Sequence, residues 1–116
     1  MRNLCLALMI LRLSALALCG EVPDAKSAAA KLGEKVAIED TVREVSITGS
    51  GTVFLNFGAA YPDEVFAAVV MKDTRSRFPD VETWSGKKVR IEGIVSDHQG
   101  HRRIILRERW QIVLVE

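Results

Sequence analysis

Cysteine is nearly absent from this 116-residue chain, and both cysteines, Cys5 and Cys19, lie within the first 20 residues. A disulfide framework, a thiol nucleophile and a cysteine-based metal site are therefore excluded from the remainder. Aromatic residues make up only 6% of the sequence, so stacking platforms are few. Lys and Arg (16) nearly balance Asp and Glu (15), which excludes a strongly basic or acidic tail.

The one long apolar stretch lies in residues 1–20 and predicts an export signal. Arg2 supplies a positive start, the apolar stretch runs from Leu4 to Cys19, and small residues occupy its end. This stretch is short for a membrane span, and Arg12 interrupts it. The alternative is a buried N-terminal helix. We expect the protein to be periplasmic or secreted.

Two processing routes are open in this segment. Ala15-Leu16-Ala17 fits a signal-peptidase site. Leu16 to Cys19 resembles the lipobox of bacterial lipoproteins, although Leu18 stands where a small residue is usual, and this makes Cys19 a candidate for lipidation. In either case the membrane is contacted only through the signal or a lipid anchor.

Residues 21–33 form a linker or a short helix, because Asp24 can cap the Ala-rich run that follows Pro23. From residue 34 to 116 the hydrophobic period is mostly two, as in strands. The first strand is expected to bend, because its apolar positions change parity midway. The expected strands are Lys35–Thr48, Thr52–Phe57, Val65–Met71, Lys87–Ser96 and Arg103–Arg107, with a short helix at Lys72–Phe78 and a strand-like tail at Trp110–Val115.

Five short strands with a helix between the third and the fourth are typical of the OB-fold, a small Greek-key barrel. We therefore predict an all-β domain with small helical elements. Closing the sheet leaves few unpaired edges, which suits a small domain without disulfides.

Several motifs also resemble a family of small exported bacterial OB-fold proteins that are described as nucleic-acid-binding. They are the segments at 33–36 (GEKV), 51–58 (GTVFLNFG), 61–66 (YPDEVF), 86–93 (GKKVRIEG) and 111–112 (QI). The resemblance covers about residues 30–115. It implies an OB domain but no catalytic residue, and it leaves the ligand open.

OB barrels bind ligands on strands two and three and in the flanking loops. On the second strand, Phe57 belongs to the predicted core face, whereas Phe54 and Asn56 point the other way and form a candidate platform. Alternatively, Phe54 lies under the N-terminal helix. Tyr61, in the next loop, either stacks on a ligand or shapes the loop.

The near-zero net charge hides an uneven distribution. Residues 86–110 hold seven Lys or Arg against three acids, whereas residues 20–85 hold seven against eleven. Arg103, Arg107 and Arg109 share one strand parity and, if they line one face with Arg90, form a basic stripe for phosphates. The alternative is an ordinary solvated face.

No phosphate loop or catalytic constellation is recognisable, so neither an enzyme nor a cofactor is predicted. His98 and His101 flank a glycine turn and are expected to be solvated rather than to bind a metal.

The prediction is an exported OB-fold module that binds ligands, with single-stranded nucleic acid favoured. The alternative is an envelope protein-interaction or oligosaccharide-binding domain. Removal of Arg2 and Arg12 with the signal leaves a net charge of about −1, which argues against a broad electrostatic attraction for nucleic acid.

Overall fold

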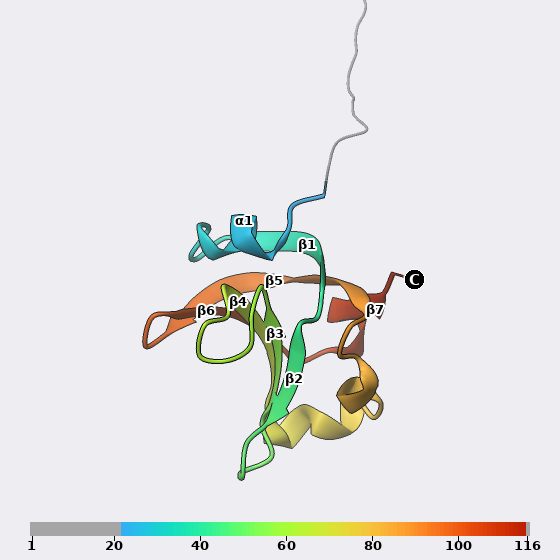
Figure 1. Ribbon diagram of the computed structural model, residues 1–116. Helices are drawn as coiled ribbons and strands as arrows, with labels where there is room; N and C mark the ends of the chain where they lie inside the picture. The colour runs from blue at the N-terminus through green and yellow to red at the C-terminus, as the bar shows by residue number, and fades with distance from the viewer. Residues whose placement is uncertain (1–21, 116) are drawn as a thin grey trace, which may run out of the picture.

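A computed structural model describes residues 22–115, so the expectations for the export signal and for Cys19 lie outside the described residues. The described chain is mostly β structure with one short α-helix, α1 (Ala25–Ala29), and three 3-10 helices (Figure 1). The strands are β1 (Lys35–Thr41), β2 (Glu44–Ile47), β3 (Val53–Phe57), β4 (Phe66–Val70), β5 (Lys88–His98), β6 (His101–Leu106) and β7 (Ile112–Leu114). The 3-10 helices are η2 (Lys72–Arg77), η3 (Val81–Thr83) and η4 (Arg109–Gln111).

The strands hydrogen-bond in the order β1-β5-β6-β4-β3-β2, and β7 pairs with β5 off this path. All pairs are antiparallel except β4 with β6. β1 and β2 lie at opposite ends of this order, yet only Val42 and Arg43 separate them in the chain, and Figure 1 shows the sharp bend between them. The bend therefore carries the chain from one end of the sheet to the other.

Seven strands, rather than the five predicted, occur within residues 22–115, for two physical reasons. The expected bend in the first strand interrupts its pairing, because the amide of Val42 donates to Lys87 O while that of Arg43 donates to Asn56 O. The tail also pairs with β5. The predicted helix between the third and fourth strands is present as η2, and η3 follows where a loop was expected.

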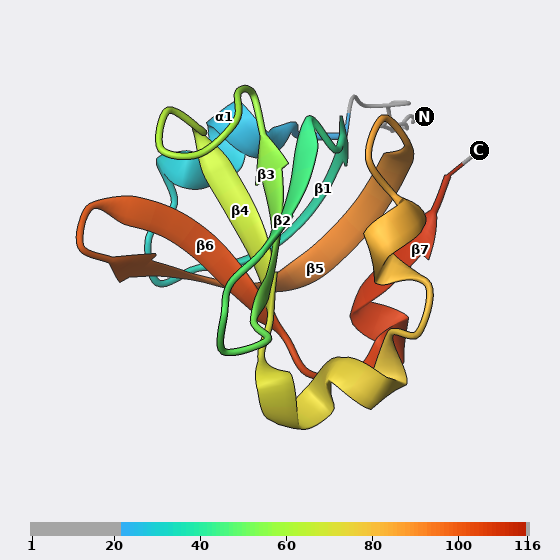
Figure 2. The same cartoon turned by 60° about the horizontal axis from the view of Figure 1, so that its bottom comes forward.

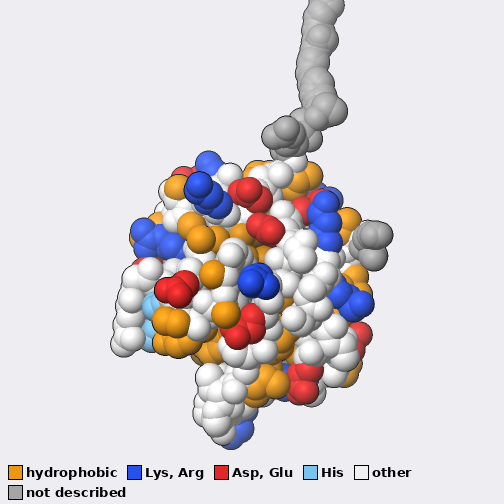
Figure 3. All heavy atoms as spheres, in the orientation of Figure 1, with side chains coloured by type: hydrophobic (Ala, Val, Ile, Leu, Met, Phe, Trp, Pro, Cys, Tyr) orange, Lys and Arg blue, Asp and Glu red, His pale blue; other side chains and the backbone are white. Residues whose placement is uncertain are grey.

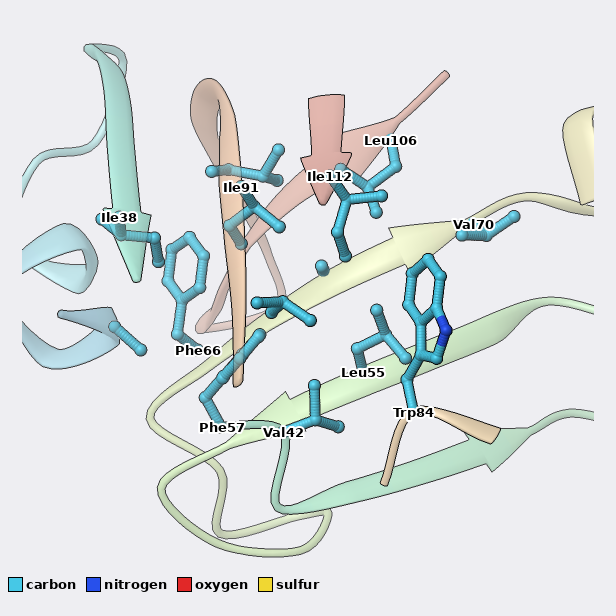
Figure 4. Packing of buried hydrophobic residues seen from close by; sticks show 14 of the residues in the cluster. Ile38, Val42, Leu55, Phe57, Phe66, Val70, Trp84, Ile91, Leu106 and Ile112 are labelled. Carbon is cyan, nitrogen blue, oxygen red and sulfur yellow. The ribbon is translucent and has the colours of Figure 1, made fainter. Parts of the chain in front are cut away.

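The core lies between the layers of the sheet and is closed by α1 and η3 (Figure 4). Val53, Leu55 and Phe57 are fully buried, as their shared parity predicts, and all five residues of β4 are buried. Trp84 is the largest fully buried side chain. Burying each large side chain of this kind stabilises the fold by about 1.5–3 kcal/mol.

Of the two alternatives for residues 21–33, a linker or a short helix, the structure forms a short helix, α1. The Asp24 side chain caps it by accepting a hydrogen bond of 2.9 Å from the amide of Ser27. Ala25 and Ala28 form its buried face and join the core cluster. No helix within residues 22–115 has both the length and the apolar character needed to cross a bilayer.

Strand β5 pairs with three other strands, and the change of partner occurs near Gly93. Its first part pairs with β1 and β7, and residues from Val95 onward pair with β6. The side chain of Gln111 bridges the opening between β5 and β6. Its Nε2 donates to Glu92 O (3.0 Å) and Ile105 O (3.4 Å), and its Oε1 accepts from the amides of residues 107 (2.7 Å) and 108 (2.9 Å).

Gly93 lets this junction close, because a Cβ there would lie 2.6 Å from Ile104 Cγ2 and 3.1 Å from Gln111 Nε2. Ile104 is fully buried and β-branched, so it cannot easily move aside. Gly93→Ala is therefore expected to destabilise the domain by about 1–3 kcal/mol in urea unfolding, as overpacking does. The control is Gly49→Ala, where no atom lies within 4 Å and φ is not positive. Equal unfolding midpoints for the two variants would contradict this account of the junction.

Candidate nucleic-acid interface

A hollow of about 310 Å³ lies on the outer face of the sheet, and we call it the aromatic pocket. The β2–β3 turn, the loop of residues 58–65 and the β5–β6 turn border it. The last two lie on the same side of the molecule in Figures 1 and 2. Its lining residues are Ser46, Thr48, Phe54, Tyr61, His98, Gln99, His101 and Arg103.

Two aromatic rings form one wall of the aromatic pocket. The rings of Tyr61 and His101 are stacked, with centroids 5.6 Å apart and planes inclined by 28°. Tyr61 is 64% exposed, so the outer side of its ring is open to a ligand. A ring already held in place loses little freedom when a planar ligand stacks on it.

The buried carboxylate of Glu64 holds His101 in this position. His101 Nδ1 lies 2.5 Å from Glu64 Oε2, and the Glu64 side chain is only 3% exposed. This contact joins the loop of residues 58–65 to β6. The other carboxylate oxygen, Oε1, is buried and has no hydrogen-bond partner among the described residues. A buried carboxylate is costly without a partner, and His101 supplies one to Glu64.

Arg103 forms the cationic part of the pocket. Its guanidinium carbon lies 5.3 Å from the centroid of the Phe54 ring, a cation–π geometry. The sheet register places Ala67 beside Arg103, and this small side chain leaves room for the guanidinium to reach β3. Burial lowers the pKa of Arg103, while the carboxylates of Glu64 and Asp97 act in the opposite direction. Arginine nevertheless stays protonated at neutral pH.

The partly buried carboxylate of Glu44 positions the loop that carries Tyr61. Glu44 Oε1 accepts hydrogen bonds from the backbone amide of Tyr61 (3.1 Å) and from Asn56 Nδ2 (2.9 Å). Asn56 Nδ2 also lies 3.3 Å from Ser46 Oγ. Asn56 itself is only 1% exposed. Its position under the pocket therefore supports the loop rather than forming an open platform.

Asp97 shapes the turn at the third border of the pocket. Its carboxylate accepts hydrogen bonds from the amide of Gly100 (3.2 Å) and from Arg102 Nη1 (2.5 Å). The hydrogen bond from Gly100, and then the one from Arg102, hold the pKa of Asp97 below its ordinary value. Gln99 in the same turn has a positive φ of 53°, and the αL conformation makes the turn tight.

Comparison with solved structures identifies the fold. Asparaginyl-tRNA synthetase from Pyrococcus horikoshii, complexed with asparaginyl-adenylate, is 18% identical, with a TM-score of 0.60, over 83% of this chain and 22% of its own. Aspartyl tRNA synthetase from Entamoeba histolytica is also 18% identical, with a TM-score of 0.54, over 83% of this chain and 21% of its own. OBody AM1L10, bound to hen egg-white lysozyme, is 14% identical, with a TM-score of 0.60, over 86% of this chain and 99% of its own.

The fold is OB-like. The chain spans only about a fifth of the length of the synthetases that it matches. No family model matches the sequence, and no curated protein is detectably similar to it. At these identities the likeness establishes the fold alone.

In this OB-like domain the structure brings together three of the predicted site residues. Phe54, Tyr61 and Arg103 all line the aromatic pocket. Phe54 thus contributes to an open surface, and the alternative that it lies under the N-terminal helix does not hold.

The four arginines of the predicted basic stripe do not line one face, and only Arg103 lines the aromatic pocket. Arg90 lies opposite Glu39 on β1, with 3.8 Å between the charged groups. Arg109 packs over the Trp84 ring, 5.2 Å from its centroid, and donates to Ile112 O. Arg107 lines a different hollow from Arg103. On the face seen in Figure 3, basic and acidic side chains are interspersed.

Two residues that shape the aromatic pocket escaped the sequence-based prediction. His101 was expected to be solvated, but it is partly buried against Tyr61 and Glu64. Glu64 stands 37 positions before its partner in the chain, in an irregular loop without period. No cluster of three His, Cys, Asp or Glu that could hold a metal ion occurs in residues 22–115.

The Asp97 turn leads to a pH prediction. Because its pKa is lower in the folded state, this carboxylate stabilises the fold above pH of about 3.8, and the contribution is lost as pH falls through the folded pKa. The stability difference between the native protein and Asp97→Asn is therefore expected to shrink in acid. NMR titration should place the Asp97 midpoint below that of the urea-unfolded chain. In Arg102→Gln the midpoint should rise but stay depressed, because the Gly100 amide remains; an undisplaced native midpoint would disprove the assignment.

Proposed function

We propose that this protein is a non-catalytic OB module that binds single-stranded nucleic acid in the aromatic pocket. The observation that carries the proposal is the combination, in one hollow, of the exposed Tyr61 ring stacked on His101 with the Arg103 guanidinium over Phe54. Aromatic faces next to basic groups are what bases and phosphates require. The pocket is lined by residues of β3, β6 and the β2–β3 and β5–β6 turns, and OB-folds use a strand face and the loops beside it for binding.

Stacking is expected to supply most of the affinity. A base on an aromatic ring contributes about 1–3 kcal/mol and tolerates any sequence. The exposed face of Tyr61 offers such a ring, and Glu44 and Glu64 hold the surrounding loop before the ligand arrives. Arg103 then supplies a positive charge for a phosphate or a base edge.

A protein partner is the second candidate, because OBody AM1L10, a structure of similar fold, is bound to hen egg-white lysozyme. The small net charge of the chain also favours this candidate. Under this alternative the same face binds an envelope protein, and oligonucleotides do not compete.

The binding proposal is tested by titrating fluorescent single-stranded oligonucleotides at several salt concentrations. Tyr61→Ala is expected to weaken binding by about 5- to 100-fold through the lost stacking contact. Arg103→Gln is expected to weaken binding and to reduce the salt slope by about 0.7 if it contacts one phosphate.

The matched control is Lys87→Gln, which removes the same charge from an exposed position that lines neither hollow. Circular dichroism and unfolding midpoints establish that each variant is folded. Wild-type protein that binds no oligonucleotide at low salt would refute nucleic-acid binding, and capture of a protein by the same face would then favour the alternative.

We further propose that the protein is exported and that residues 1–20 are removed or lipidated. The support is the apolar stretch with its small residues and Cys19. Mass spectrometry of the protein from membrane and soluble fractions is expected to find a processed N-terminus. A start at Cys19 with added acyl mass indicates a lipid anchor, whereas a start after Ala17 indicates simple cleavage. An intact Met1 would contradict export.

A further inference from the structure

A second hollow, of about 500 Å³, lies farther along the outer face of β6, and we call it the tryptophan hollow. Its apolar surface comes from Ile94, Ile105 and Trp110, and its polar rim includes Lys35 and Arg107. Trp110 is 61% exposed and Ile94 60% exposed. Exposed apolar side chains that lie together inside a polar rim, as these do, are typical of an interaction site.

The two hollows are neighbours on one strand. Side chains alternate along β6, so Ile104 and Leu106 point into the core and the residues at 101, 103 and 105 point outward. Of these outward side chains, His101 and Arg103 line the aromatic pocket, and Ile105 lines the tryptophan hollow. Ser96, which lines the tryptophan hollow, donates from Oγ to Arg103 O at 3.3 Å. A ligand that leaves the aromatic pocket along β6 therefore meets the tryptophan hollow next.

The local structure also holds Trp110 in place. Helix η4 carries it and begins with a capping box between Glu108 and Gln111. Gln111 is in turn tied to both β5 and β6 through its side chain. The backbone that carries Trp110 is thus joined to β5 and β6 through Gln111.

The charges around the tryptophan hollow favour an anionic ligand. Within residues 22–115 no carboxylate forms an ion pair with Arg107 or Lys35. The one acid that lines the hollow, Glu108, lies 3.4 Å from Arg77 Nη1 and so is partly neutralised. A cation beside an exposed indole is the combination that suits a phosphate next to a base.

We propose that the tryptophan hollow is a second subsite for the same single strand. One base stacks on Tyr61 in the aromatic pocket, the strand follows β6, and a later base stacks on Trp110 with a phosphate at Arg107. This inference rests on the proposed nucleic-acid function and adds to it a minimum ligand length and a direction along β6.

The experiment compares oligothymidylates of about 4 and about 12 nucleotides, within the range that OB-folds occupy. The chain has two tryptophans, and Trp84 is only 1% exposed, so ligand quenching of the intrinsic fluorescence reports on Trp110. The long oligonucleotide is expected to bind more tightly and to quench the fluorescence, and the short one to bind without quenching.

Variants separate the two subsites. Trp110→Ala is expected to weaken binding of the long oligonucleotide by about 5- to 100-fold and to leave the short one unchanged. Arg107→Gln is expected to reduce the salt slope for the long oligonucleotide alone by about 0.7. Leu114→Ala, which shortens an exposed side chain outside both hollows, is the control and is expected to change neither.

The outcomes distinguish the two proposals. If both oligonucleotides bind through Tyr61 with equal affinity and Trp110→Ala has no effect, the second subsite is refuted while the proposed function stands. If neither oligonucleotide binds, the proposed function fails and the second subsite fails with it. If Trp110 responds to a protein ligand but to no oligonucleotide, the hollow is a protein-docking site and the proposal is likewise overturned.

Discussion

Strand β5 pairs with β1 and β7 over its first part and with β6 over its last part, and the rest of the domain depends on the point where these partners change. Where two strands diverge, backbone groups lose their ladder partners, and such groups are costly when they are buried. One side chain, Gln111, meets this demand with two donated and two accepted hydrogen bonds. Gly93 provides the space, because any Cβ at this position would strike Ile104. The C-terminal residues are therefore part of the fold rather than an appendage.

This junction also positions the face of β6 that carries both hollows. Because β6 is positioned by β5 on one side and by β4 on the other, its outward side chains have a rigid base. The two hollows lie on that outward face, one on each side of the middle of β6. The buried carboxylate of Glu64 is costly in this setting, but the nearby His101 and the positive charge of Arg103 offset its cost. The same contacts fix the stacked rings of Tyr61 and His101 in the wall of the pocket.

The sequence predicts the features that depend on local pattern and misses those that depend on register. Alternation placed Val53, Leu55 and Phe57 in the core and Phe54 on the opposite face, and the change of parity located the bend before β2. The same alternation could not show that Arg90 faces Glu39, since that depends on which residues pair across β1 and β5. Nor could it connect Glu64 with His101, because an irregular loop has no period to follow. The two tryptophans illustrate the same limit, as Trp84 is buried and Trp110 exposed although both follow short polar segments.

Charge and stacking must contribute unequally to any affinity for nucleic acid. With nearly balanced charges, the domain has no broad attractive field, and separated charges are screened within about 8–10 Å at physiological salt. Two local arginine contacts would give a salt slope of only about 1.4 for a single strand, far below that of strongly basic binders. Two stacking platforms at about 1–3 kcal/mol each would be barely affected by salt. A ligand that spans both hollows is therefore held mainly by its bases, and its length matters more than the ionic strength.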